Sequence, residues 1–251
     1  MGSYLLDKLE FVGMCVMNVI THYDLLIDEN NDPFRDSPPL QEYMNGWDGE
    51  LFLESLELSK NKNVLEIGIG TGRIAVKVAP NCMRLTGIDI SPKTIERAKE
   101  NLKEYSNICF VCGDFNEYDF VETFDVIYSS LTMMHFKDKA TVITKVDKLL
   151  NDSGIFCLSI DKNQSEYIDM GTRKIMVYPD TLDNITLIQI QFHLKQVSSV
   201  LNHGQKKCAA TFKIHWVSKL MIFMVLPKLA VLVFRLNVKN KPVCTLTKTT
   251  S

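Results

Sequence analysis

The sequence predicts an α/β fold in which helices cover both faces of a mostly parallel sheet. From residue 63 onward, short β-type runs alternate with amphipathic stretches of helical period. Such alternation along the chain is typical of a parallel sheet with crossover helices. The length of 251 residues is enough for one large domain with a real core. We expect a helical lid over residues 1–59, the sheet domain over 60–186 and an irregular tail over 187–251.

The expected elements follow one another in a regular order. Residues 4–20 are apolar with roughly helical spacing, residues 29–39 are rich in turn formers, and residues 40–59 again look helical. Ser91 is a good N-cap and Pro92 suits the first helical position after it. We expect strands at 64–68, 84–90, 108–112, 124–130 and 155–160, and helices at 72–79, 92–104 and 138–150. Ligands bind such sheets at the carboxyl ends of the strands.

Charge is divided unevenly along the chain. Residues 1–186 hold all 30 acidic residues, whereas residues 187–251 hold ten basic residues and no acid. The acidic body argues against nucleic acid as a partner. Three interpretations of the tail stay open: an out-of-frame translation, which we favour, a basic membrane-surface segment, or a pair of closing strands. The longest apolar run, 220–234, is short for a membrane span and is interrupted at Pro227 and Lys228, so we expect no membrane association.

Seven cysteines are scattered at irregular spacings. Their odd number suits reduced thiols and a cytoplasmic protein, and the N-terminus lacks the basic region of a secretory signal. Cys109 and Cys112 form a CxxC, but no second CxxC or histidine pair completes a zinc site. We therefore expect no metal and interpret both cysteines as residues of a buried strand.

The stretch LEIGIGTG carries the first chemical signal. Gly68, Gly70 and Gly72 end the first core strand and open the first helix, where glycine permits a tight turn and the close approach of a ligand. A dinucleotide fingerprint would require a small residue where Arg73 stands, and its pyrophosphate would disfavour a carboxylate such as Glu66. Glu66 suits a ligand that has a positive charge and no phosphate.

Two further stretches, GIDISP and CGDFNEYDF, follow LEIGIGTG in order, and together the three resemble the motifs of class I S-adenosylmethionine (SAM)-dependent methyltransferases, which have a Rossmann-like fold. The resemblance covers roughly residues 60–161. It implies SAM as the cofactor, with Glu66 near the methionine amino group and the glycines beneath the ligand. It also implies that Asp89 binds the ribose beside Ile90, that Asp114 and Phe115 contact the adenine, and that Ser129, near the end of the strand closest to the transferred methyl, contacts the cofactor.

The acceptor side is less defined. The fourth core strand ends in Tyr-Ser-Ser-Leu instead of the Asn/Asp-Pro-Pro-Tyr of many base and glutamine methyltransferases, which favours a small-molecule acceptor. His135 is either a general base or a structural histidine that anchors its loop. Tyr23 resembles a lid residue that closes over the methionine end of the cofactor. Tyr43 and Trp47 are either aromatic substrate contacts or ordinary helix packing.

These observations predict a SAM-dependent methyltransferase that acts on a small molecule, with the acceptor atom and the oligomeric state left open. One alternative is an NAD(P)-dependent Rossmann oxidoreductase, against which Glu66 and Arg73 count. The other is a catalytically silent SAM-binding protein.

Overall fold

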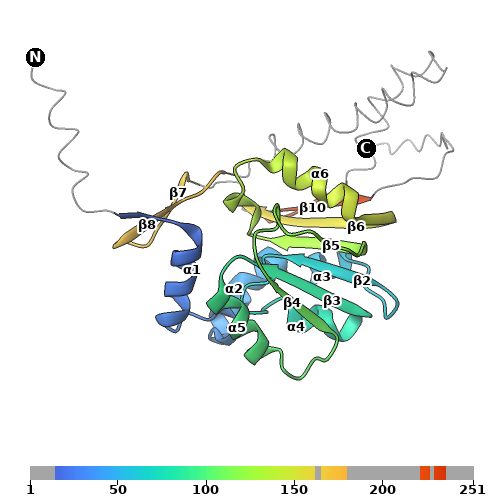
Figure 1. Ribbon diagram of the computed structural model, residues 1–251, viewed down its shortest axis with the longest axis horizontal. Helices are drawn as coiled ribbons and strands as arrows, with labels where there is room; N and C mark the ends of the chain where they lie inside the picture. Colours follow the sequence, from blue (N-terminus) through green and yellow to red (C-terminus); the bar gives the residue numbers. More distant parts are fainter. Residues whose placement is uncertain (1–14, 162–164, 180–220, 227–228, 236–251) are drawn as a thin grey trace, which may run out of the picture.

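The computed structural model describes residues 15–161, 165–179, 221–226 and 229–235 (Figure 1). Its main sheet has seven strands in the order β4-β3-β2-β5-β6-β10-β9. The strands are β2 Asn63–Ile67, β3 Arg84–Asp89, β4 Ile108–Cys112, β5 Phe124–Ser130, β6 Leu150–Asp161, β9 Met221–Leu226 and β10 Leu229–Arg235. The first five pair in parallel, as the sequence predicts. The fold is thus Rossmann-like, with β2 in the middle of the five parallel strands.

Alternate residues of the central strands point to two separate apolar layers. Val64 and Val126 face one layer, whereas Leu65 and Ile127 face the other, as the period of two along a strand requires. The first layer packs under α3 (Glu50–Ser55), α4 (Ala75–Val78) and α5 (Pro92–Asn101). The second layer packs under α6 (Lys139–Leu149), so helices cover both faces of the sheet (Figure 1).

The N-terminal region departs from the expected helix. Residues Cys15–Met17 form the short strand β1, and α1 begins only at Val19 and runs to Asp28. β1 pairs in parallel with β8 (Arg173–Met176), which pairs with β7 (Tyr167–Asp169) in a separate three-stranded sheet. The strand partner overrides the helical spacing of residues 15–17, and the Asn18 side chain then caps α1 by accepting from the Thr21 N–H at 2.8 Å. The expected helix over residues 4–14 lies outside the described residues.

The connection from α1 to the main sheet contains the helical segments expected after the loop. The 3₁₀ turn η1 spans Pro33–Arg35, and α2 spans Pro38–Asp48 just before α3. Two further 3₁₀ turns, η2 (Ala79–Asn81) and η3 (Met133–His135), follow α4 and β5. The described part of the lid region, residues 15–59, therefore consists of the strand β1, the helices α1, α2 and α3 and the 3₁₀ turn η1.

The tail region contributes two strands where the sequence predicts an irregular segment. β10 pairs antiparallel with β6 from Leu229 opposite Asp161 to Arg235 opposite Ile155, and β9 pairs with β10. Residues 221–226 and 229–234 of the apolar run thus lie in a strand pair at one edge of the sheet, as the closing-strand interpretation requires. The out-of-frame interpretation concerns the origin of the tail and stays a prediction. In the described part of the chain, every helix is too short or too polar to cross a membrane.

The prediction that Cys109 and Cys112 lie in a buried strand is also wrong. β4 is the edge strand of the main sheet, so Cys112 is exposed and Cys109 is partly exposed, where we expected both to lie in a buried strand. Both are free thiols, as are Cys82 and Cys157.

Candidate functional site

The glycine turn after β2 contains an open cradle. Gly68, Gly70 and Gly72 have φ angles of 79°, 56° and 96°, a region that favours glycine. A Cβ at Gly68 would meet Thr132 at 2.2 Å, and a Cβ at Gly72 would meet Leu102 at 2.6 Å, so both positions are closed by packing. A Cβ at Gly70 would meet no described atom within 4 Å. The turn is therefore rigid at both ends and open at its middle.

Asp89 ends β3 beside this cradle. One carboxylate oxygen accepts from the Gly70 N–H at 3.0 Å, and the other accepts from the Ser91 N–H at 3.0 Å. Burial raises the pKa of Asp89, and the two backbone bonds only partly oppose that rise. The carboxylate thus lies at the rim of the turn, where it can also accept hydrogen bonds from a ligand.

Glu66 lies beneath the turn in the core. Its side chain is buried, and its Oε2 accepts from the Tyr128 hydroxyl at 2.8 Å. Burial raises the pKa of Glu66 well above its ordinary value, and the bond from Tyr128 and the charge of Arg73 only partly oppose this rise. A cation that enters the cradle would favour the charged form of Glu66. The carboxyl groups of Asp89 and Glu66 therefore fit a ligand that has hydroxyls at one end and a positive charge at the other.

Arg73 joins the turn to the lid region. Its two terminal nitrogens donate to the two carboxylate oxygens of Asp48 at 2.6 and 2.5 Å, and the Ser130 hydroxyl donates to the same carboxylate at 2.5 Å. Burial by itself lowers the pKa of Arg73, but the bonds to Asp48 outweigh it and raise the pKa. Sequence reasoning missed Asp48 and Ser130, because a lone acid at a helix end carries no specific signal.

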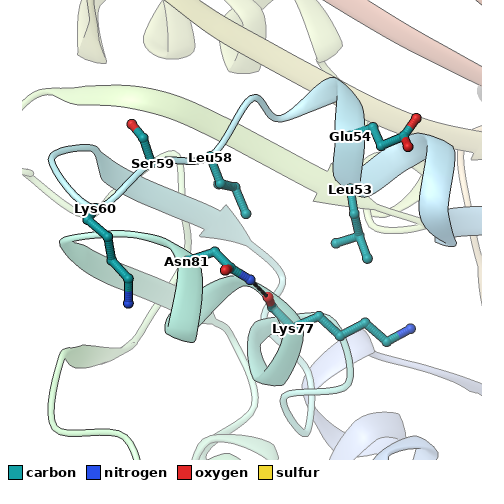
Figure 2. A pocket seen from close by; sticks show the side chains of 7 residues that line it. All are labelled: Leu53, Glu54, Leu58, Ser59, Lys60, Lys77 and Asn81. Atoms are coloured by element: carbon teal, nitrogen blue, oxygen red, sulfur yellow. Dashed lines mark hydrogen bonds between the residues drawn. The ribbon is translucent and has the colours of Figure 1, made fainter.

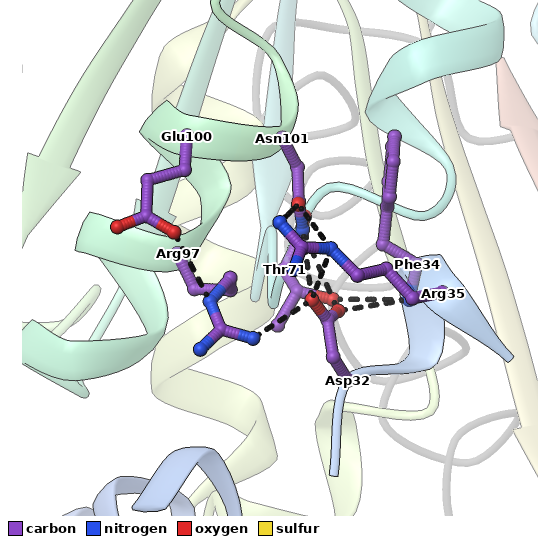
Figure 3. Close-up of polar contacts among 7 residues, drawn as sticks. All are labelled: Asp32, Phe34, Arg35, Thr71, Arg97, Glu100 and Asn101. Atoms are coloured by element: carbon purple, nitrogen blue, oxygen red, sulfur yellow. Dashed lines mark hydrogen bonds and ion pairs between the residues drawn. The ribbon is translucent and has the colours of Figure 1, made fainter. Parts of the chain in front are cut away.

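A second polar cluster holds the other side of the turn (Figure 3). The buried Asp32 carboxylate accepts from Arg97 at 3.2 Å and from Asn101 at 3.2 Å. Asn101 also donates to the Thr71 carbonyl at 3.0 Å, and the Phe34 N–H donates to the Thr71 hydroxyl at 3.3 Å. Burial alone would raise the pKa of Asp32, but hydrogen bonds that this carboxylate accepts from the side chains of Thr71, Asn101 and Arg97 and from the Phe34 N–H lower it. The loop that sequence reasoning took for simple turns thus anchors the residue between Gly70 and Gly72.

The lid helix α1 brings Tyr23 to His135, which lies just beyond the end of β5. The Tyr23 hydroxyl is 2.7 Å from the His135 Nε2, and the rings meet edge to face at 5.4 Å. Burial, followed by the charges of His22 and Lys139, lowers the pKa of His135 to about 4. Burial also raises the pKa of Tyr23. Both groups are therefore neutral at pH 7, and the tautomer of the imidazole determines which of them donates the hydrogen bond.

Three other predicted site residues, Asp114, Ser129 and Phe115, make contacts within the protein's own structure. The Asp114 carboxylate accepts from the Asn116 N–H at 2.7 Å in a local turn, and the Ser129 hydroxyl donates to the Ile67 carbonyl at 3.0 Å. Phe115 is 3% exposed and packs in the core against Phe120 and Phe136. Their predicted contacts with a ligand stay predictions.

The remaining predicted site residues are Ile90, Tyr43 and Trp47. Ile90 is partly exposed between Asp89 and Ser91, next to the cradle. Tyr43 lies on α2 and is 58% exposed, and the side chain of Trp47 on the same helix lies outside the described part.

A separate cavity lies away from this site (Figure 2). Its volume is about 590 Å³, and it lies between α3, the segment before β2 and the end of α4. The lining residues are Leu53, Glu54, Leu58, Ser59, Lys60, Lys77 and Asn81. None of them belongs to the glycine turn or to the Tyr23–His135 pair.

Comparison with known proteins gives one consistent result. Residues 58–215 match the family model described as "Methyltransferase domain". Nodulation protein S of Sinorhizobium fredii is 29% identical over 156 residues, which cover 59% of this chain and 71% of that protein. A putative protein N5-glutamine methyltransferase of Methanocaldococcus jannaschii is 34% identical over 145 residues, which cover 57% of this chain and 68% of that protein.

A solved structure shares the fold. The crystal structure of the N-methyltransferase NodS from Bradyrhizobium japonicum, in complex with S-adenosylhomocysteine (SAH), aligns with a TM-score of 0.56 and 20% identity. The alignment covers 89% of this chain and 100% of that one.

Proposed function

Since this chain belongs to the methyltransferase domain family, we propose that it transfers a methyl group from SAM to a small-molecule acceptor. The observation that carries the proposal is the open space at Gly70 beside the Asp89 carboxylate, in the turn that follows Glu66 at the end of β2. SAM has a ribose diol for a carboxylate acceptor and a cationic methionine end for a buried acid. When bound, it supplies an already activated methyl group, so the protein's task is alignment and exclusion of water.

The residues of the turn would hold the cofactor in distinct ways. The backbone at Gly70 forms the floor, and Asp89 accepts from the ribose hydroxyls while keeping its bond from the Gly70 N–H. Glu66 gives the methionine amino group a negative partner. The Arg73–Asp48 and Asp32–Asn101 contacts hold the turn in this shape before any ligand arrives, which reduces the entropy lost on binding.

Tyr23 and His135 form the acceptor side. We propose the tautomer in which the neutral imidazole directs its Nε2 lone pair at the Tyr23 hydroxyl. An acceptor O–H or N–H that replaces this hydroxyl would donate to the same nitrogen. We propose that His135 anchors Tyr23 in the resting enzyme and takes the acceptor's proton after that exchange. The lowered pKa keeps the imidazole unprotonated at neutral pH, and it also makes the imidazole a weaker base than an ordinary histidine.

The end of β5 supports a small-molecule acceptor. The Tyr128 hydroxyl donates to Glu66 and the Ser129 hydroxyl donates to the Ile67 carbonyl, so both side chains are used in hydrogen bonds within the protein. They leave no side-chain clamp at this point for a base or a glutamine amide. We further propose a cytoplasmic location, because Cys82, Cys109, Cys112 and Cys157 are free thiols.

Calorimetric titration with SAH tests the cofactor site. We expect Asp89→Ala and Gly70→Ala each to weaken SAH binding at least about tenfold, since each removes a contact or fills the cradle. Gly171→Ala is the matched control for Gly70→Ala, because Gly171 also has a positive φ of 79° and open space around its Cβ. Both changes carry the same backbone strain, but only the one at Gly70 lies in the proposed site.

The outcomes separate the three candidate functions. SAH binding that survives both Asp89→Ala and Gly70→Ala would refute the site, and tighter binding of NAD than of SAH would favour the oxidoreductase. SAH binding without methyl transfer to any amine, hydroxyl, thiol or glutamine-peptide acceptor would favour the silent binding protein. Transfer to the peptide alone would refute the small-molecule assignment.

A further inference from the structure

Lys139, the first residue of α6, is an unusually buried cation. Its relative exposure is 7%, and its Nζ donates to three backbone carbonyls: Met133 at 2.7 Å, Tyr178 at 2.9 Å and Phe136 at 3.1 Å. A buried ammonium destabilises a fold unless hydrogen bonds replace its water. An apolar residue could fill this volume without that desolvation cost, so the charge requires an explanation beyond packing.

The three carbonyls define what Lys139 holds. Met133 and Phe136 lie on either side of His135, so the ammonium closes the short turn that carries the imidazole. Tyr178 lies beyond β8 and fastens the same turn from outside. Its N–H donates to the carbonyl of the residue before His135 at 2.7 Å. The turn is thus held on both sides of the histidine.

The same small sheet also carries the partner of His135. β1 leads directly into α1, which places Tyr23, and β8 leads to Tyr178. Arg173 at the start of β8 makes a two-pronged ion pair with Glu29 at the end of α1, at 2.5 and 2.6 Å. Tyr23 is therefore tied to β8 through α1, and His135 is tied to the segment after β8 through Lys139.

The charges around His135 are few. His22 and Tyr23 face it from α1, and Lys139 faces it from α6. Burial is the largest cause of the lowered pKa of His135, and the fields of His22 and Lys139 act in the same direction. The contacts that fix the turn thus also bring a positive charge near the ring.

We propose that Lys139 is a positioning residue for methyl transfer, which fixes the turn of His135 so that its Nε2 meets the Tyr23 hydroxyl and, later, the acceptor. This inference rests on the proposed function for its role in catalysis. Its structural part, the control of His135, is measurable without any acceptor.

The test compares Lys139→Met with Lys148→Met in the full chain. Lys148 lies on the same helix and is exposed, so its change removes an equal charge from the solvent side. Histidine side chains labelled with ¹⁵N are titrated by NMR, with His135→Asn to assign the signal. We expect the His135 midpoint to move upward from about 4 in Lys139→Met, and to stay in place in Lys148→Met. SAH affinity should change less than about twofold in both variants.

Lys139→Arg tests the role of charge and hydrogen bonding, since arginine keeps both. We expect it to return the midpoint part of the way, and Lys139→Gln provides the neutral donor if the Met variant does not fold. With an acceptor in hand, Lys139→Met should lower kcat about tenfold and shift the acidic limb of its pH profile upward.

An unchanged titration midpoint of His135 in Lys139→Met, with only a lower Tm, would overturn the proposal. Lys139 would then stabilise the fold without acting on His135. This outcome differs from failure of the proposed function, which appears as SAH binding insensitive to Asp89→Ala.

Discussion

The ion pair between Arg73 and Asp48 should matter far more to stability than a surface pair of the same length. Its bonds measure 2.6 and 2.5 Å, and the Asp48 side chain has 0% relative exposure against 17% for Arg73. Lys93 and Asp28 form a pair of 2.5 Å between α5 and α1, with both side chains 48% exposed. The two pairs share their distance and differ in burial, so they isolate its effect.

Asp48→Ala leaves the Arg73 guanidinium buried without its carboxylate. Removing one partner of a buried pair costs about 3–5 kcal/mol, whereas exposed pairs contribute about 0–1 kcal/mol. A domain of this size loses roughly 2–4 °C in Tm per kcal/mol. We therefore expect Asp48→Ala to lower Tm by roughly 6–20 °C, and Asp28→Ala to lower it by no more than about 4 °C.

Two double-mutant cycles provide the measurement. Urea unfolding of Asp48→Ala, Arg73→Met and the double variant yields one coupling energy, and Asp28→Ala with Lys93→Met yields the other. We expect the buried pair to couple by about 2 kcal/mol or more and the exposed pair by less than about 1 kcal/mol. Equal coupling energies would refute the argument from burial.

Two further predictions concern pH and the tail. Since the folded pKa of His135 is about 4 and its ordinary value is 6.5, the unfolded chain binds more protons between these values, so stability falls as pH falls. Urea unfolding across this range should show a loss of roughly 3 kcal/mol that His135→Asn removes, and an unchanged slope in that variant would contradict it. A chain ending at residue 186 should unfold at lower urea, because β6 loses its pairing with β10. Equal stability of the shortened and full-length chains would favour the out-of-frame interpretation of the tail.

Local pattern was sufficient to predict the glycine turn and the acid beside it. The glycine turn and Asp89 lie at the ends of β2 and β3, neighbouring strands whose order follows from a short crossover. Their contact, from Gly70 to Asp89, joins residues within one strand–helix–strand unit. Local pattern predicted the wrong secondary structure where pairing with a segment distant in the sequence determined it. Residues 15–17 have helical spacing but pair with β8, more than 150 residues later in the chain.

The sequence by itself determined the parallel sheet, the turn at Gly70, the acid at its rim and hence the cofactor chemistry, because strand period, glycine spacing and helix caps act over a few residues. Only the tertiary structure decided that Tyr23 meets His135, that Asp48 and Asp32 brace the turn, and that Lys139 holds the histidine. Each of these is an ordinary polar residue in isolation. Its role comes from burial next to a partner, and burial is a property of the packed chain.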